Sequence, residues 1–261
     1  NSDSTSLGLN ESKGVTTLTS ERIGKVDFSS ASIAAADVKI NGFNALAADF
    51  ATDLTVTTTN TAKTVADAIN ANSGVHGAEA NAFNSFTSEA VGTFNQTGTF
   101  TINGNAVETA SSYAGLVTNI NESVSGVDAK LNSDNTITLT NTNGDDIIIA
   151  GTAANSKSVG FGGNATYAGF ISLENIDGSP LTIEAGNVAN GYTGGSGTIV
   201  DVNNLGFNEF SVAGKLETAI VSGTALSANE IMINDVLIDE SLSGAAHHIA
   251  ATINAKTADH G

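Results

Sequence analysis

Four ionisable residues near the end of the chain are of types that bind metals. His247 and His248 are adjacent, and His260 follows Asp259. Zinc proteases of the HExxH class need a glutamate directly after the first histidine, where it acts as general base, and a second histidine one helical turn later. No glutamate follows His247 or His248. We therefore interpret the histidines as a partly exposed helix face, not as a metal site.

Two other parts of the sequence have residues typical of calcium loops. Residues 194–197, Gly-Gly-Ser-Gly, begin like a calcium-binding nonapeptide repeat, but the next acidic ligand would fall at Ile199 and only one copy is present. Asp134, Asp145 and Asp146 supply carboxylates of the kind that bind calcium. Aspartates in hairpin loops usually have only solvation and turn roles. We predict these roles for the three aspartates, and a turn at residues 194–197.

No residue pattern typical of catalysis stands out from the background of 27 acidic side chains. There is no Ser-His-Asp order, phosphate loop or distinct pair of carboxylates. The sequence therefore predicts no catalytic residue, no cofactor-binding residue and no metal ligand, and it predicts that the protein is not an enzyme. The N-glycosylation patterns at Asn95 and Asn164 are expected by chance in a chain so rich in Asn and Thr.

Charge and composition narrow the classes of partner. Nine basic residues against 27 acidic ones give a net charge of −18, which repels phosphate backbones and anionic lipids. Nucleic acid and membrane are therefore not expected as partners. The chain has no cysteine, which excludes disulfides and thiolate sites. It has no signal-peptide pattern and no initiator methionine, so we expect it to be part of a longer protein.

Short alternating runs bounded by Asn, Asp and Gly predict that the chain is rich in strands. Residues 136–140 and the strand at Ile147 enclose an Asn-Gly turn signal, which predicts a hairpin. Residues 171–173 and 181–183 enclose Asp177-Gly178 and predict a second hairpin. Helical periodicity is confined to three short segments, residues 64–72, 112–122 and 242–255.

One pattern occurs three times along the chain. Its copies begin with Val-Lys-Ile-Asn-Gly at residues 38–42, Phe-Thr-Ile-Asn-Gly at 100–104 and Ile-Met-Ile-Asn-Asp at 231–235. Each copy predicts a strand, a tight turn, a second strand and a short helix. A further strand should start at Gly74-Val75 in the first copy and at Gly126-Val127 in the second. The apolar positions of the motif are predicted to be buried: Val38, Ile40, Ile69, Phe100, Ile102, Ile120, Ile231, Ile233 and Ile253.

A longer duplication contains two of these copies. Leu-Gly-Leu-Asn-Glu at residues 7–11 matches Leu-Gly-Phe-Asn-Glu at residues 205–209, and each precedes a strand motif. We therefore predict a repeat module in residues 1–82, an inserted outer domain with the second copy in residues 83–200, and a homologous, truncated module in residues 201–261.

The predicted fold class is α+β and strand-rich, with two to three small modules of antiparallel or mixed sheet and short helices, joined end to end. The first copy is longer than the others, so an extra hairpin is expected around residues 50–59. Gly-rich residues 191–197 are expected to form the linker that returns from the insertion.

The ordered unit of Ile-Asn-Gly, Ala-Ile-Asn and Gly-Val resembles the flagellin internal repeat. That repeat occurs in the central regions of bacterial flagellins and of the filament-capping hook-associated protein. The resemblance spans all three copies. It departs from the family in the long first copy, in Asp235 at the turn position of the third copy, and in the absence of the long terminal helices through which flagellins polymerise.

The resemblance implies a structural subunit of the flagellar filament, of which this chain forms the surface-exposed outer part, outside the cell. Its partners would be other flagellin subunits, through terminal regions absent here, so the chain itself is expected to be monomeric. O-linked glycans on exposed Ser and Thr are a further expectation. Two alternatives stay open: a domain of the filament cap, and a surface adhesin or carbohydrate-binding module.

Overall fold

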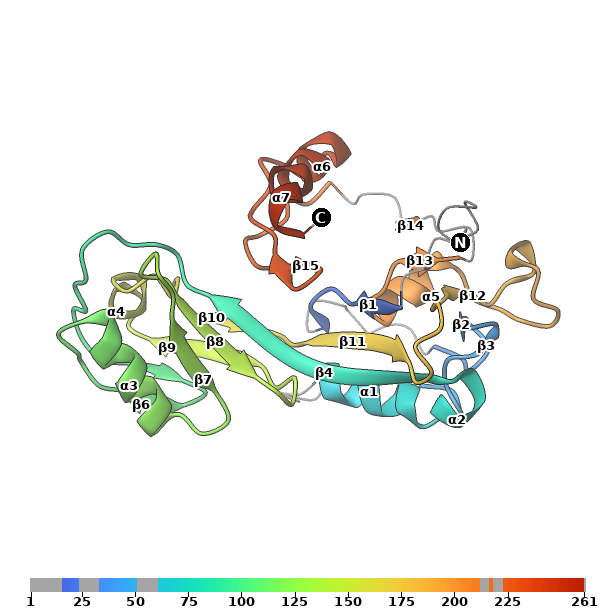
Figure 1. The fold of residues 1–261 in the computed structure, drawn as a ribbon, viewed down its shortest axis with the longest axis horizontal. Helices are drawn as coiled ribbons and strands as arrows, with labels where there is room; N and C mark the ends of the chain where they lie inside the picture. Colours follow the sequence, from blue (N-terminus) through green and yellow to red (C-terminus); the bar gives the residue numbers. More distant parts are fainter. Residues whose placement is uncertain (1–15, 24–32, 51–60, 212–215, 218–222, 261) are drawn as a thin grey trace, which may run out of the picture.

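Antiparallel strands and short helices form an α+β fold in the computed structural model of the chain (Figure 1), which describes residues 16–23, 33–50, 61–211, 216–217 and 223–260. Strands account for 28% and helices for 24% of the chain. The described residues form seven α-helices and four sheets, all with antiparallel pairing. The predicted strand-rich fold class is therefore confirmed.

The elements follow one another in a mixed order of strands and short helices. The strands are β1 (Thr17–Thr19), β2 (Val38–Ile40), β3 (Phe43–Asn44), β4 (Ala78–Thr87), β5 (Phe100–Ile102), β6 (Asn105–Val107), β7 (Asp128–Leu131), β8 (Ile137–Asn141), β9 (Ile147–Gly151), β10 (Ala165–Tyr167), β11 (Phe170–Asn175), β12 (Ile183–Ala185), β13 (Glu209–Phe210), β14 (Leu216–Glu217), β15 (Met232–Ile233) and β16 (Val236–Leu237). The helices are α1 (Thr61–Asn70), α2 (Ser73–His76), α3 (Tyr113–Ser123), α4 (Ala153–Lys157), the 3-10 helix η3 (Val188–Asn190), α5 (Ile199–Asn204), α6 (Ala246–Ala255) and α7 (Thr257–His260).

The long strand β4 connects two cores. Its first part pairs with β11, with Ala80 opposite Leu173, and its last part pairs with β8, with Phe86 opposite Leu139. The resulting five-stranded sheet has the order β1-β11-β4-β8-β7. Two further sheets, β10-β9-β5-β6 and β14-β13-β12-β2-β3, each contain one copy of the repeated hairpin, and β15-β16 forms a separate two-stranded ribbon.

The two main cores differ in how the chain builds them. The first core takes residues from the segments 23–80 and 171–210, whereas the second takes residues from the continuous segment 86–161. The domain limits at residues 82 and 200 remain predictions. In the structure β4 runs through residue 82, and the first core uses residues up to Phe210.

The tight turns of the three repeats have the same backbone conformation. Asn41 and Gly42 have φ of 52° and 81°, and Asn103 and Gly104 have φ of 48° and 78°. Asn234 and Asp235 follow with φ of 45° and 64°. Two consecutive positive φ values are those of the turn that best fits twisted two-residue hairpins. Asp235 therefore occupies the glycine position at some steric cost, as aspartate tolerates this region better than most residues.

A side-chain clamp joins the helix to the following strand in the first two copies. The Asn70 amide donates to the Ala80 carbonyl at 2.8 Å and accepts from the Ala80 N–H at 2.7 Å. Asn121 makes the same two bonds to Ala129, at 3.1 Å and 2.7 Å. One asparagine thus satisfies both polar groups of a strand residue, as a neighbouring strand would.

Six of the nine motif positions predicted to be buried are confirmed as fully or almost fully buried, from Val38 to Ile120. Ile231, Ile233 and Ile253 in the third copy are only half-buried, so the prediction is wrong there. Of the apolar residues described between 223 and 260, Met232 and Ile238 are buried. The third copy therefore has a much smaller core than the other two.

Both predicted hairpins are wrong, although their turns exist. The chain turns after β8 because the Asn141 side chain accepts from the N–H groups of Asn143 and Asp145, but β9 then joins another sheet and pairs with β5 and β10. Likewise β11 pairs with β1 and β4, and β12 with β2 and β13. A turn signal fixes where the chain reverses, not which strand it meets next.

The three predicted helices form, with shifted limits. Ser112 caps α3 by accepting from the Gly115 N–H at 3.1 Å. The segment expected from residue 242 becomes helical only at Ala246. The strand expected at Gly74 is helix α2 instead, and β4 starts after Gly77, whose φ of 76° ends that helix. Most of the extra hairpin expected at residues 50–59 lies outside the described residues, but Phe50 pairs with Ile33.

Candidate functional site

Of the histidines that suggested a metal, the structure describes the side chains of His247 and His248, and they do not form a metal site with other described residues. The rings of His247 and His248 lie 4.0 Å apart on α6, and His248 Nδ1 is 2.7 Å from the Ser243 hydroxyl. The side chain of His260 lies outside the described part of the chain. Among the described residues, no three His, Asp or Glu side chains are grouped so that they could hold a metal ion.

The three aspartates are separated as well. Asp134 lies before β8 and Asp145 and Asp146 after it, so the strand keeps them at opposite ends. Asp134 accepts from the Thr136 N–H at 3.0 Å and from its hydroxyl at 2.7 Å, and these bonds hold the pKa of Asp134 below its usual range. Asp134 therefore has the turn role predicted for it.

The Gly-rich segment 191–197 packs closely against other backbone at its C-terminal end, from Gly195 to Gly197, and is not a free linker. A side chain at Gly195 would meet the Gly186 carbonyl, and one at Gly197 would meet the backbone of Asp37. Ser196 donates from its hydroxyl to Asp37 Oδ1. The expectation of a return linker is thus corrected, because these glycines allow two stretches of backbone to approach closely.

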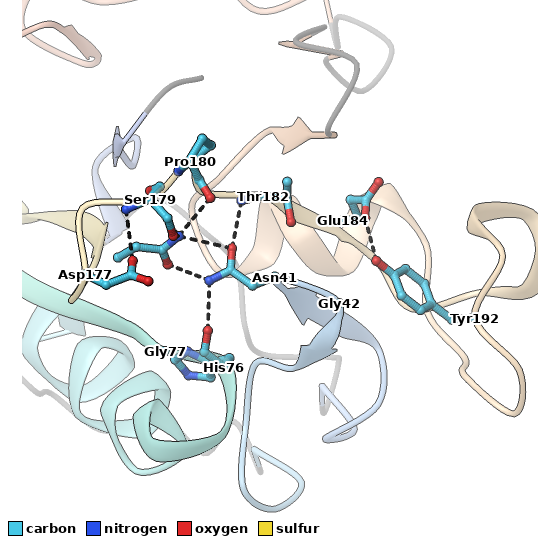
Figure 2. Close-up of a pocket in the computed structure, with 11 residues that line it drawn as sticks. Asn41, Gly42, His76, Gly77, Asp177, Ser179, Pro180, Thr182, Glu184 and Tyr192 are labelled. Carbon is cyan, nitrogen blue, oxygen red and sulfur yellow. Dashed lines mark hydrogen bonds between the residues drawn. The ribbon is translucent and has the colours of Figure 1, made fainter. Parts of the chain in front are cut away.

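An open cavity of about 490 Å³ lies where the β2–β3 turn, the junction of α2 with β4, and the start of β12 meet. Figure 2 shows Asn41 at its centre, with His76 on one side and the segment 179–182 on the other. Tyr192 and Glu184 line the far end of the cavity. These side chains include an imidazole, a phenol and carboxylates, so the cavity is the first place to look for chemistry.

The side-chain amide of Asn41 is fully used in hydrogen bonds to neighbouring residues. It donates to the His76 carbonyl at 2.8 Å and to Asn175 Oδ1 at 2.5 Å, and its oxygen accepts from the Thr182 N–H at 3.1 Å. Asn175 donates in turn to the Pro180 carbonyl at 2.8 Å. The network joins segments far apart in the sequence, and it therefore works as a structural joint.

His76 is held in one neutral form. Its Nδ1 accepts from the Ala78 N–H at 3.2 Å, so the proton is on Nε2, which lies 3.1 Å from the Ile69 carbonyl and donates to it. Burial lowers the pKa of His76, and the bond to Ile69 offsets part of this effect. Because both ring nitrogens are used by the backbone, His76 orders the α2–β4 junction and is not placed to transfer protons.

Tyr192 and Glu184, at the far end of the cavity, form a hydrogen bond with each other. The Tyr192 hydroxyl donates to Glu184 Oε2 at 2.5 Å, and burial together with this bond raises the pKa of Tyr192. The Lys39 ammonium lies 5.6 Å from the centre of the Tyr192 ring. A phenol with a raised pKa that donates to a carboxylate is not activated as a nucleophile.

A buried arginine that the chemical motifs missed hydrogen-bonds to several distant segments. Arg22 is 4% exposed, and its guanidinium donates to Asn84 Oδ1 at 2.9 Å, to the Ser85 carbonyl at 2.7 Å and to the Ala168 carbonyl. It also donates to the Asn229 carbonyl at 2.5 Å, which brings the third copy to the same point.

Two aromatic rings and two acidic side chains also lie close enough to Arg22 to affect it. The guanidinium lies 4.4 Å from the centre of the Phe170 ring and 5.6 Å from that of Tyr167. Burial lowers the pKa of Arg22 to about 10, with opposing effects from Tyr167, Asp146 and Glu230. Arg22 is the only arginine in the sequence, which was the available signal for a specific role. We call this group the Arg22 junction.

Asp146, near this junction, has an unusual environment. Its Oδ1 is buried and accepts no hydrogen bond among the described residues. Burial and the neighbouring Asp145 raise the pKa of Asp146 to about 6, while Arg22 acts in the opposite direction. A raised pKa can mark a catalytic acid. Here the buried Oδ1 lacks a hydrogen-bond partner among the described residues, and this makes the charged form of Asp146 costly.

Comparison of the chain with models of protein families and with curated proteins gives no match. In the part of the chain that the structure describes, none of the helices has the length and apolar character needed to cross a membrane.

Proposed function

We propose that this chain is the surface-exposed outer part of a bacterial flagellin, a structural component of the flagellar filament and not an enzyme. The observation that carries the proposal is the threefold repeat with its equivalent Asn-based turns. The sequence of the repeat resembles that of the flagellin internal repeat. The turn geometry supports the idea that the copies are true structural equivalents.

The side chains around the cavity support a structural role. Asn41, His76 and Tyr192 all form hydrogen bonds within the protein, and Arg22 connects strands and loops of both cores. Polar groups arranged in this way order the backbone and leave no base or nucleophile poised for a substrate. The function would then reside in the exterior of the molecule.

The charge of the exterior fits that role. A net charge of −18 with few basic residues would limit nonspecific adhesion between closely spaced copies. In the proposed setting the protein would project outward from the filament, in contact with the medium. There it would determine surface properties such as solubility and antigenicity, while polymerisation would rely on terminal regions outside this chain.

The test is to insert the chain, in place of the native outer domains, between the terminal helical regions of a flagellin. We expect filaments that carry an added outer layer in electron micrographs, and antibodies against residues 61–211 that label the whole filament. The absence of filaments from a subunit whose terminal regions are folded would contradict the proposal.

A deletion sharpens the same test. Phe83 on β4 lies opposite Phe170 on β11, so replacing residues 84–169 with Asn-Gly would close these strands into a hairpin. A subunit with this deletion should still polymerise, since the second core would project outward. The isolated chain should sediment as a monomer, and spontaneous fibres would show that it carries assembly contacts of its own.

A further inference from the structure

The three copies of the repeat differ in how much of the helix they bury. In the first two copies the helix contributes fully buried residues to a core, and in the third copy α6 has no buried residue. Ile249 and Ile253 occupy the positions of Val65 and Ile69 but are only half-buried. The apolar face of α6 therefore lacks the cover that the other helices have.

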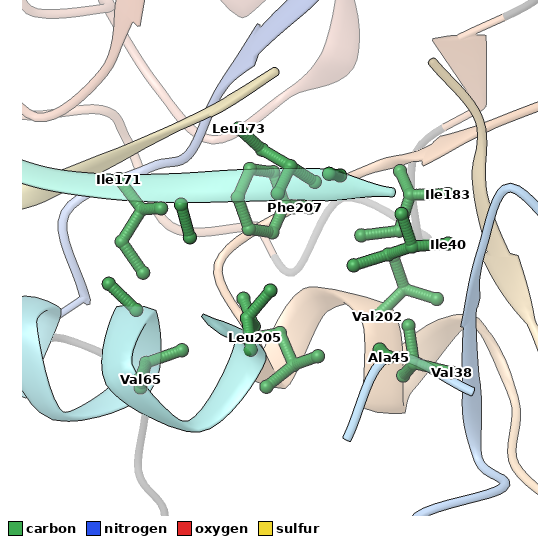
Figure 3. Packing of buried hydrophobic residues seen from close by; sticks show 14 of the residues in the cluster. Val38, Ile40, Ala45, Val65, Ile171, Leu173, Ile183, Val202, Leu205 and Phe207 are labelled. Carbon is green, nitrogen blue, oxygen red and sulfur yellow. The ribbon is translucent and has the colours of Figure 1, made fainter. Parts of the chain in front are cut away.

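The missing cover can be identified from the complete copies. In the first copy β4 runs alongside α1 and packs on it, and Figure 3 shows Val65 pointing from the helix toward the core beneath that strand. Asn70 holds the strand through both polar groups of Ala80. The equivalent residue in the third copy is Asn254, which is exposed and whose side-chain amide has no hydrogen bond to any other described residue.

The sequence that leads into the strand is repeated as well. Residues 253–261, Ile-Asn-Ala-Lys-Thr-Ala-Asp-His-Gly, align without a gap with residues 69–77, Ile-Asn-Ala-Asn-Ser-Gly-Val-His-Gly, and five of the nine positions are identical. The short helix α7 corresponds to α2. In the first copy this segment ends at Gly77, and β4 starts at the next residue.

We propose that the open face of α6 is a docking site for a β-strand supplied in cis, by polypeptide joined directly to Gly261. Asn254 would hold this strand through both backbone polar groups of one residue. That residue would be the tenth after Asn254, as Ala80 is the tenth after Asn70. The proposal concerns the fold of the third copy and holds whether or not the chain belongs to a filament.

The chemistry of the occupant follows from β4. Ala78 and Ala80 face inward and are buried, while Glu79 and Asn81 between them are exposed. A small residue is needed opposite the asparagine, because its amide must approach the strand backbone as closely as another strand would. The docking strand should therefore carry small apolar residues at every second position and polar residues between them.

The experiment uses the whole chain with the ten residues of β4, Ala-Glu-Ala-Asn-Ala-Phe-Asn-Ser-Phe-Thr, added after Gly261. Hydrogen exchange of the α6 amides should slow by at least about tenfold relative to the chain without the addition. Exchange in α1 should not change and serves as the internal reference. A chain that carries the same ten residues in scrambled order, with glutamate opposite Asn254, is the matched control and should show no slowing.

Asn254→Ala separates docking from simple lengthening of the chain. In the extended protein it should remove most of the added protection, and in the unextended protein it should change nothing. Equal exchange with the ordered and scrambled additions would overturn the proposal. Equal protection from the free ten-residue peptide, at a concentration matched to the protein, would overturn the assignment in cis and make the face a site for another chain.

Discussion

The first and second cores contain the same repeated unit, but they are built from different chain segments and different apolar side chains. The first core is mostly aliphatic and combines two distant parts of the chain, residues 23–80 and 171–210. The second core lies within residues 86–161 and contains several aromatic contacts, including Phe100 with Phe161 at 5.6 Å between ring centres. In both, an Asn-Gly turn and an asparagine clamp hold the helix on its strand. The repeated unit thus keeps the same turn and the same clamp although different apolar side chains pack around it.

Because the two cores share few residues, we expect each to unfold separately. Ile69 and Ile120 are equivalent and fully buried, so replacing either with alanine should cost about 2–5 kcal/mol of unfolding free energy. We expect Ile120→Ala to speed hydrogen exchange mainly in residues 86–161, and Ile69→Ala mainly in the first core. Ile253→Ala, at the half-buried equivalent position, is the matched control and should cost about 1 kcal/mol or less.

If either single variant accelerates hydrogen exchange equally in both cores, the expectation that the cores unfold separately is wrong. Such a result would mean that the shared strand β4 makes the two cores one cooperative unit. Denaturant titrations followed by exchange and by circular dichroism would distinguish the cases, since separate units give transitions that do not coincide.

Arg22→Met tests how strongly the cores are joined. The substitution keeps an apolar side chain beside Phe170 but leaves Asn84 Oδ1 and the carbonyls of Ser85 and Ala168 without their donor. We expect the free energy of unfolding to fall by about 3 kcal/mol, because buried hydrogen-bond acceptors without partners are costly. The control is Lys63→Met, which removes an exposed pair with Asp67 and should change stability by less than about 0.5 kcal/mol.

The smallest expected effect is the pH dependence of the Arg22 junction. The pKa of Asp146 is raised to about 6 in the folded protein, so the folded state binds a proton more readily than the unfolded chain. The associated stability is present below about pH 4 and is lost as the pH rises through about 6. Stability should therefore increase on acidification from pH 7 to pH 5.

Asp146→Asn should flatten this dependence and make the protein more stable at pH 7, as measured by urea unfolding. Asp134→Asn provides the opposite sign, because hydrogen bonds from Thr136 lower the pKa of Asp134 and stabilise its charged form. An unchanged pH profile in Asp146→Asn would show that the carboxylate finds a partner in solution. Asp146 would then not act as an unpaired buried acid beside Arg22.

Local features of the fold were predictable from the sequence, and long-range ones were not. Asn-Gly after an alternating run fixes the turn at Asn41, and the apolar spacing of α1 and α3 fixes which face is buried. The partners of β8 and β11 depend on strands far along the chain, which no turn signal encodes. The cavity around Asn41 was not predicted, because the asparagine looks like an ordinary turn residue. Arg22 could have been noticed as the only arginine in an acidic chain.

The discontinuous first core constrains the order in which the chain can fold. Ala80 and Leu173 pair across a loop that contains the entire second core, and closing so long a loop in a disordered chain costs entropy. Formation of the second core brings Phe83 and Phe170 together and shortens the loop that remains. We therefore expect pulse-labelled hydrogen exchange during refolding to protect β8 before β11, so that the insertion acts as the nucleus for the module into which it is inserted.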